Sequence, residues 1–209
     1  MKVLVIGTGN MGAGFVKQLV TAGHQVSVTA RDQAKARSLA QQFGAVAVAS
    51  ADSATSVDAI VLATPYAEAV AALRTVGELT GKTVIDITNP LTPDYMGLTL
   101  GHNTSAAEEI AKAVPGAEVV KGFNTVFAQV LAEGAEWGDG QKVTVFVASD
   151  SERAKQTARA LAESMGFRVM DSGGLQNARY LEPVAGLNIY FGYGAGLGTG
   201  IAPTWIRKA

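Results

Sequence analysis

Short runs of β-branched and small apolar residues recur along this chain, separated by stretches with helical spacing. Eight runs predict strands, at residues 3–6, 26–29, 45–48, 59–64, 83–87, 118–123, 143–148 and 167–170. Several are almost continuous in Val, Ile and Ala, which is typical of parallel strands buried on both faces. The pattern therefore favours a sheet covered by helices on both sides.

The segments between these runs carry helix start and stop signals. After Asp32, apolar residues recur at 36, 39, 40 and 43, and Gly44 follows as a stop. Ser105 and Glu108 form a capping box for a helix to residue 114, and Asp150 is expected to cap a helix ending at 166. This alternation predicts an α/β fold of the Rossmann type: a doubly wound, mostly parallel sheet with a short C-terminal α/β extension.

Composition narrows the function classes. The chain has 209 residues, of which 48% are hydrophobic, enough for a full core, and 17% are charged. This charged share lies below the usual quarter, which indicates that the chain itself or a second copy covers more surface than normal. Lys and Arg number 17 against 18 Asp and Glu, a net charge of −1. Binding to nucleic acid or an anionic membrane is therefore not expected.

Two residue types that build metal and redox sites are scarce. The chain has no cysteine, which excludes disulfides, thiolate ligands and cysteine nucleophiles, and its two histidines, His24 and His102, make no His-rich metal site. We expect no metal. The apolar run at 3–6 is too short for a signal peptide, and no apolar stretch reaches 18 residues. The chain is therefore expected to be cytoplasmic.

A glycine motif follows the first predicted strand. Gly7, Gly9 and Gly12 form a G-x-G-x-x-G pattern, which is weak by itself in a chain with 24 glycines. Here it sits between a strand and a helix, and a second strand follows within thirty residues. In that context Gly7 allows a tight turn, Gly9 lets backbone approach a pyrophosphate, and Gly12 lets helix and strand pack closely. We therefore expect a dinucleotide-binding Rossmann core at 1–126, with a C-terminal α/β portion at 127–209 packed on the same sheet.

The end of the second strand indicates which dinucleotide binds. An NAD site places a carboxylate there, whereas this chain has Ala30, then Arg31, with Lys35 four residues on. Asp32 is the nearest acid, and as a helix cap it should be engaged by backbone N–H groups. An Arg fork beside a Lys suits a 2′-phosphate, so NADP(H) is favoured over NAD(H), although a solvated helix face gives a similar pattern.

Further strand ends should reach the same crevice. They bring candidate cofactor residues Ala63, Thr64, Pro65, Asn89 and Pro90, and candidate substrate-side residues Phe123, Asn124 and Thr125. Ordinary turn chemistry explains Thr64–Pro65 and Asn89–Pro90 equally well.

The last forty residues are less regular. Residues 178–192 predict one helix, and glycine then occupies every second position from 192 to 200. These glycines fit a flexible tail, or a segment whose backbone approaches a flat ligand or a second subunit.

No catalytic acid or base stands out, so catalytic side chains stay unassigned. Hydride transfer between nicotinamide and a flavin-like ring requires orientation and exclusion of water rather than a protein acid or base. Two alternatives stay open. A nonenzymatic NADP(H)-binding sensor would also lack catalytic side chains, and a reductase of small imines or carbonyls would need a helical domain for which too few residues follow the last strand.

Several motifs together resemble the NADPH-dependent F420 reductases, over essentially the whole chain. The motifs are those around residues 5–12, 30–35, 85–90, 121–125, 171–174 and 178–183. The architecture is also similar to the NADPH-binding domain of membrane ferric reductases.

This resemblance implies an oxidoreductase that holds NADP through Thr8, Gly9, Asn10, Met11, Arg31 and Lys35. It implies direct hydride transfer to a stacked deazaflavin (F420) or flavin ring, and a homodimer. Ala30 departs from the pattern, because a Ser often assists the 2′-phosphate there. The second substrate stays open between F420 and a flavin such as FMN or FAD.

Overall fold

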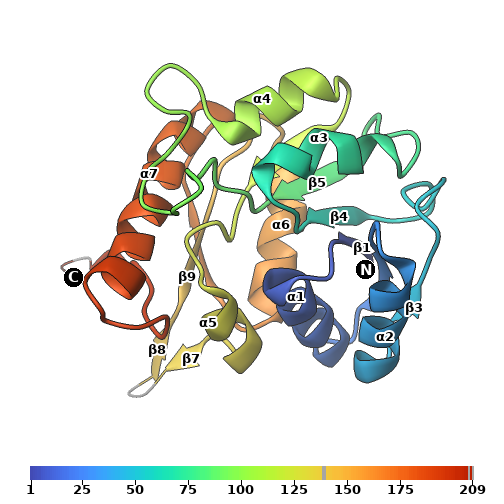
Figure 1. Cartoon of the computed structure of the whole chain (residues 1–209), viewed down its shortest axis with the longest axis horizontal. Helices are drawn as coiled ribbons and strands as arrows, with labels where there is room; N and C mark the ends of the chain where they lie inside the picture. Colours follow the sequence, from blue (N-terminus) through green and yellow to red (C-terminus); the bar gives the residue numbers. More distant parts are fainter. Residues whose placement is uncertain (138–139, 207, 209) are drawn as a thin grey trace.

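The computed structural model, which describes residues 1–137, 140–206 and 208, is built around a six-stranded sheet (Figure 1). All its neighbouring strands run parallel, in the order β3-β2-β1-β4-β5-β6. The strands are β1 (Lys2–Ile6), β2 (Gln25–Thr29), β3 (Val46–Ala47), β4 (Ala59–Leu62), β5 (Thr83–Asp86) and β6 (Glu118–Lys121). This order confirms the predicted Rossmann-type fold and places the topological switch between β1 and β4, where such sheets bind ligands.

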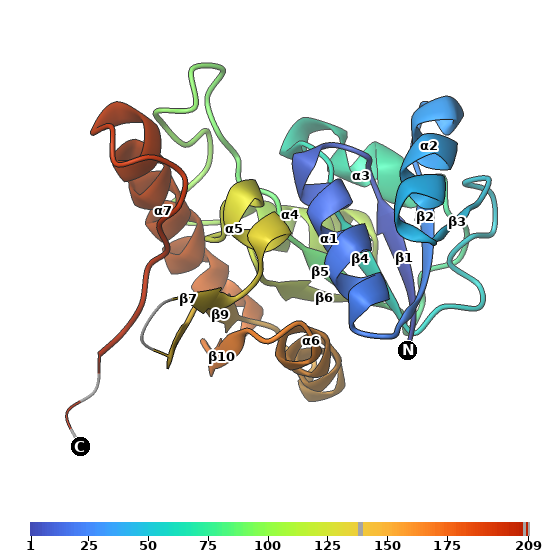
Figure 2. The same ribbon diagram turned by 90° about the horizontal axis from the view of Figure 1, so that it is seen from below.

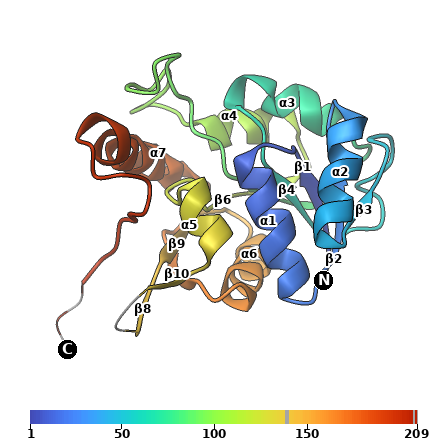
Figure 3. The ribbon, with the colours of Figure 1, turned by 60° about the horizontal axis from the view of Figure 1, so that its bottom comes forward.

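Helices cover both faces of this sheet, as its apolar strands require (Figure 3). One face packs on α1 (Asn10–Thr21), α2 (Gln33–Phe43), α5 (Ala128–Glu133) and α6 (Glu152–Ser164). The other packs on α3 (Tyr66–Arg74), α4 (Ala106–Ala113) and a short 3-10 turn, η2 (Leu175–Asn177). No helix among the described residues is both long and apolar enough to cross a membrane.

The predicted strands are present but mostly shorter than expected, and one helix cap differs. Asp32 caps α2 as expected, with its side chain accepting from Ala34 N and Lys35 N. The expected cap of α6 by Asp150 is wrong, because the neighbouring Ser151 accepts from Ala154 N and begins the helix. The carboxylate of Asp150 instead accepts from Leu175 N at 2.9 Å, across the chain.

The C-terminal portion adds small sheets of its own. Strands β9 (Thr144–Val147) and β10 (Arg168–Asp171) pair in parallel, and one antiparallel bridge, Lys121 to Ala148, links β9 to β6. A short hairpin of β7 (Glu136–Trp137) and β8 (Gln141–Lys142), absent from the prediction, precedes them. The division of the chain at residue 126 therefore stays a prediction.

Helix α7 (Ala178–Ile189) continues into a π-helical turn, η3 (Tyr190–Gly194). The chain then leaves the end of this helix (Figure 2) and reaches residues 144–147, where the rings of Trp205 and Phe146 have centroids 5.3 Å apart. Gly192 has a packing reason, since a Cβ there would lie 2.7 Å from Cζ of Phe127. At least one of the alternating glycines thus lets backbone approach an aromatic ring of the same chain.

Candidate active site

The turn between β1 and α1 is packed so tightly that only glycine fits two of its positions. Gly7 has φ of +118°, and a Cβ built on it would lie 2.2 Å from Ala63 O. A Cβ on Gly12 would lie 2.2 Å from Gly7 O. These contacts draw the start of α1 against the end of β4, at the switch point of the sheet.

Gly9 has a different environment. No atom lies within 4 Å of the Cβ that a side chain would add there, so the space in front of it is open. Gly9 is the N-cap of α1, and no side chain caps this helix. The N–H groups of the first turn, which includes Asn10 and Met11, therefore lie at an open helix N-terminus suited to an anion.

Two cations lie beyond β2, on the same edge of the sheet. The Arg31 side chain is 88% exposed, with Nη1 3.6 Å from Oε2 of Glu68 on α3. Lys35 Nζ lies 4.0 Å from a carboxylate oxygen of Asp32. Exposed pairs of this length contribute little stability, so both cations can exchange partners for a phosphate at small cost.

A cavity of about 210 Å³ opens beside the start of α1. Four of its residues are predicted site residues: Met11, Asn89, Asn124 and Thr125. Sequence reasoning missed the others, Tyr95, Val126, Phe127, Ala128, Ala185, Asn188, Ile189 and Tyr193. The lining contains no carboxylate, imidazole or cationic group. The cavity is therefore uncharged, with aromatic rings and amides as its main features.

Amide hydrogen bonds fix the polar wall of this cavity. Asn89 Nδ2 donates to Asn124 O at 2.9 Å, and Asn124 Nδ2 donates to Asn89 Oδ1 at 3.0 Å and to Leu181 O at 2.9 Å. Asn188 Nδ2 donates to Thr125 O at 3.1 Å. The ends of β5 and β6 are thus joined to each other and to α7.

Several buried polar atoms near this edge have no hydrogen-bond partner within the described part of the chain. They are Thr64 Oγ1, Thr88 Oγ1, Asn124 Oδ1 and Thr125 Oγ1. Each residue follows the carboxyl end of β4, β5 or β6. Because unpaired buried polar groups are costly, these atoms suit a polar ligand that completes their hydrogen bonding. Two of the four residues, Asn124 and Thr125, line the cavity.

The structure places some predicted residues in supporting positions. Phe123 is 1% exposed and packs against Phe15 and Phe167, with ring centroids 4.9 and 5.8 Å apart, so its ring belongs to the core, and its place on the substrate side stays a prediction. Pro65 is the N-cap of α3, and Pro90 O accepts from Thr99 N at 2.7 Å, which anchors the following loop.

The two histidines lie outside the cavity. His24 lies before β2, at the opposite edge of the sheet, where Nε2 contacts Ser164 Oγ at 2.8 Å. Burial and the N-terminal ammonium group lower the pKa of His24. His102 is exposed in the loop after β5. Among the described residues, no three potential ligands come together as a metal site.

One buried charge cluster lies behind the cavity. Lys121 Nζ is 2.6 Å from Asp86 Oδ2 and 2.8 Å from Glu182 Oε1, and all three side chains are at most 1% exposed. Burial opposes the charge on Lys121, but the carboxylates of Asp86 and Glu182 outweigh it and hold the pKa of Lys121 above its usual value.

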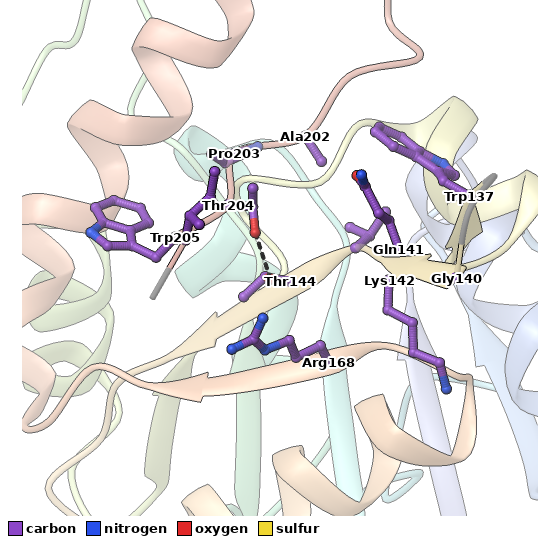
Figure 4. Close-up of a pocket in the computed structure, with 12 residues that line it drawn as sticks. Trp137, Gly140, Gln141, Lys142, Thr144, Arg168, Ala202, Pro203, Thr204 and Trp205 are labelled. Atoms are coloured by element: carbon purple, nitrogen blue, oxygen red, sulfur yellow. Dashed lines mark hydrogen bonds between the residues drawn. The ribbon is translucent and has the colours of Figure 1, made fainter. Parts of the chain in front are cut away.

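A larger cavity, of about 750 Å³, lies elsewhere (Figure 4). It is bordered by the β7–β8 hairpin, by β9 and β10, and by the C-terminal segment with Trp205. None of the residues predicted to bind a nucleotide lines it. Size alone therefore does not identify the active site. Met11, in the first turn of α1, and Asn124 and Thr125, with unpartnered polar atoms, line the smaller cavity.

Comparison with known proteins identifies the class. The family model described as NADP oxidoreductase, coenzyme F420-dependent, matches residues 2–90. The F420-dependent NADP reductase of Methanothermobacter thermautotrophicus is 32% identical over 207 residues, which cover 90% of this chain and 88% of that protein. The Metalloreductase STEAP3 of Rattus norvegicus is 29% identical over 184 residues, but this chain spans only 36% of its length.

Solved structures agree. A crystal structure from Arthrobacter sp. FB24, described as a candidate F420-dependent NADP reductase, matches with TM-score 0.86 and 29% identity over 99% of this chain and all of that one. A reductive aminase from Aspergillus terreus matches with TM-score 0.69 at 18% identity, over 93% of this chain and 62% of its own, which shows the fold alone. The chain is therefore an NADP-dependent oxidoreductase with a Rossmann-type fold. It belongs to the family of F420-dependent NADP oxidoreductases, as its motifs indicated.

The structure of the glycine turn predicts that replacing Gly7 and replacing Gly9 by alanine have different effects on the free energy of unfolding. Gly7→Ala should lower the free energy of unfolding by about 2–5 kcal/mol, because it adds backbone strain and a collision with Ala63 O. Gly9→Ala should cost less than about 1 kcal/mol, because its Cβ enters open space at a helix cap. Urea denaturation of the ligand-free proteins measures both, and equal losses would contradict this account of the turn.

Proposed function

We propose that this chain transfers hydride directly between NADP(H) and a deazaflavin of the F420 type, with a flavin as the second candidate acceptor. The observation that carries the proposal is the uncharged cavity of about 210 Å³. It meets the glycine turn at Met11 and presents aromatic and amide groups. Such a lining suits a flat ring stacked on nicotinamide, and the family's F420-dependent members favour the deazaflavin.

The glycine turn would hold the dinucleotide. The glycine turn and the first turn of α1, together Gly7, Thr8, Gly9, Asn10, Met11 and Gly12, would offer backbone N–H groups to the pyrophosphate. Ala30, Arg31 and Lys35 lie where the 2′-phosphate of the adenosine ribose would rest. The residues after β4 and β5, Ala63, Thr64, Pro65, Asn89 and Pro90, would then border the nicotinamide.

When bound, the nicotinamide and the acceptor ring would supply the hydride chemistry, and with NADPH as the donor one proton would come from solvent. The chain's own contribution is orientation and exclusion of water. Asn89 and Asn124 form the polar wall of the cavity. Phe127 and Tyr193, whose ring centroids are 5.9 Å apart, add two aromatic rings to its lining.

Two other readings receive less support. A nonenzymatic sensor shares the dinucleotide turn, but it gives no reason for an uncharged cavity lined by aromatic rings and amides beside that turn. The imine reductases and reductive aminases share the fold alone at 18–21% identity, and this chain spans 62–63% of their length. Neither reading rests on a specific observation in the cavity.

The first test follows the fate of the hydride. NADPH deuterated at nicotinamide C4 is mixed with the protein and with F420, FMN or FAD, and nicotinamide oxidation is followed by absorbance. We expect acceptor-dependent oxidation and deuterium on the reduced deazaflavin, because a hydrogen bound to carbon does not exchange with water. With F420 as the acceptor, oxidation without label on the reduced ring would contradict direct transfer, and no oxidation with any acceptor would contradict the proposed activity.

The second test concerns the 2′-phosphate. Arg31→Ala should weaken NADPH binding by about 10- to 100-fold and leave NADH binding nearly unchanged, because a charge-assisted bond to phosphate contributes about 1.5–3 kcal/mol. Arg37→Ala, at an exposed arginine on α2, the helix that follows Arg31, is the matched control and should behave like the native chain. Calorimetric titration gives both affinities, and equal losses for NADPH and NADH would exclude this role for Arg31.

We also propose a homodimer that covers the outer side of α7. Most large apolar side chains that stay exposed lie on this helix and the segment after it, including Tyr180 (71%), Leu187 (54%) and Tyr193 (64%). Leu187→Glu should therefore shift sedimentation from dimer to monomer, whereas Val46→Glu, at an equally exposed site on β3, should not. A monomeric native chain at micromolar concentration would exclude the dimer.

A further inference from the structure

Three charged residues from three separate motifs meet in the interior of this protein. Asp86 and Lys121 are the last residues of β5 and β6, and they are in register across the two strands. Their side chains share a face of the sheet with Val84 and Val119, where α4 packs. Glu182 reaches them from α7, so the cluster joins the sheet edge to a helix about sixty residues further along the chain.

Glu182 also connects two helices. Its Oε2 accepts from Ala106 N at 2.9 Å, and its Oε1 accepts from Ala107 N at 3.2 Å. These N–H groups belong to the first turn of α4, whose positive end favours a carboxylate. The Glu182 carboxylate therefore accepts hydrogen bonds from the first turn of α4 and also pairs with the Lys121 ammonium group.

The cluster touches the same segments that form the polar wall of the 210 Å³ cavity. Lys121 Nζ donates to Thr88 O at 2.7 Å, directly before Asn89. Leu181, directly before Glu182, accepts from Asn124 through its carbonyl. None of the three charged residues lines the cavity. They lie behind it, and their contacts reach the residue before Asn89 on one strand end and the residue before Glu182 on α7.

The ion pairs of Lys121 with Asp86 and Glu182 restrict the position of α7 more narrowly than apolar packing does. Hydrophobic burial is non-directional, so α7 could slide along the sheet with little change in buried area. An ammonium group that donates to two carboxylates and a carbonyl, all excluded from water, has one arrangement, because a displaced partner leaves a buried charge uncompensated. The position of α7 is therefore fixed relative to the ends of β5 and β6.

We propose that Lys121, Asp86 and Glu182 form a positioning cluster, which sets the distance between α7 and the β5 and β6 ends and thereby the geometry in which the acceptor ring meets nicotinamide. The cluster acts through Asn89 and Asn124, not by contact with substrate. This inference rests on the proposed hydride transfer, because it concerns the same cavity. A purely stabilising cluster would affect unfolding and leave acceptor kinetics alone.

Glu182→Gln is the sharpest variant, because it keeps the side chain's size and leaves Lys121 neutralised by Asp86 alone. We expect NADPH affinity within about twofold of the native value, a raised KM for the acceptor and a kcat about 10- to 100-fold lower, since small misplacements of reacting groups have effects of this size. Glu182→Asp, which keeps the charge, should recover part of kcat.

Arg179→Gln is the matched control. The Arg179 guanidinium donates to both Glu108 carboxylate oxygens, at 2.9 and 2.7 Å, so it also joins α7 to α4. This pair is partly exposed, and neither residue forms a hydrogen bond or ion pair with β5 or β6. We expect Arg179→Gln to lower the free energy of unfolding while the acceptor kinetics stay native.

Hydrogen exchange provides a readout independent of activity. In Glu182→Gln the amides of 88–89, 124 and 178–189 should exchange faster, while those of α1 stay protected. Native acceptor kinetics in Glu182→Gln, or losses that match those of Arg179→Gln, would overturn the positioning role. If the native chain reduces no deazaflavin or flavin, the proposed function fails, and unchanged exchange in the three segments would separately overturn this inference.

Discussion

Close contact between backbone segments at the switch point of the sheet is the constraint on which the rest of this structure depends. The Ala63 and Gly7 carbonyl oxygens occupy the volume that side chains at positions 7 and 12 would need. Because β1, α1 and the end of β4 approach so closely, the open N-terminus of α1 faces the carboxyl edge of the sheet. The uncharged cavity, the exposed arginine and the unpartnered hydroxyls all lie along that edge.

A second constraint acts on α7, and it is electrostatic rather than steric. The other helices that cover the sheet bury apolar stripes, whereas α7 also inserts a carboxylate, Glu182, beneath the sheet edge. Removing a lysine and two carboxylates from water is unfavourable, and the geometry that compensates for it is narrow. The helix that contributes Ala185 and Asn188 to the cavity is therefore held by an ion pair whose geometry is narrow.

Local signals in the sequence identified much of this molecule. The strand runs, the Asp32 cap and the glycine turn depend on neighbours within a few residues, so pattern and chemistry were enough to place them. The position of Asp150 misled, because Ser151 beside it is an equally good cap and the alternative use of the carboxylate lies at Leu175. The strand-end position of Phe123 likewise did not reveal that its ring turns into the core.

The cavity wall from α7 and the buried cluster had no local signal. Ala185, Asn188 and Tyr193 look like ordinary helical residues, and they become part of the site because Glu182 and Asn124 anchor their helix to strands that end about sixty residues or more earlier. Charged residues inside otherwise apolar motifs were the available clue: Asp86 and Lys121 each end a buried strand, where an unpaired charge is not tolerated.

The charged side chains of this region lie outside the lining of the cavity. The cavity itself is lined by no carboxylate, imidazole or cationic group, so no charged side chain in its lining would favour the charged or the neutral form of a bound ring. The buried charges lie behind the polar wall, where the Lys121 ammonium group and the carboxylates of Asp86 and Glu182 sum to a net charge of −1. A site for transfer between two rings benefits from both properties, because orientation then comes from the scaffold while the reacting face stays electrostatically quiet.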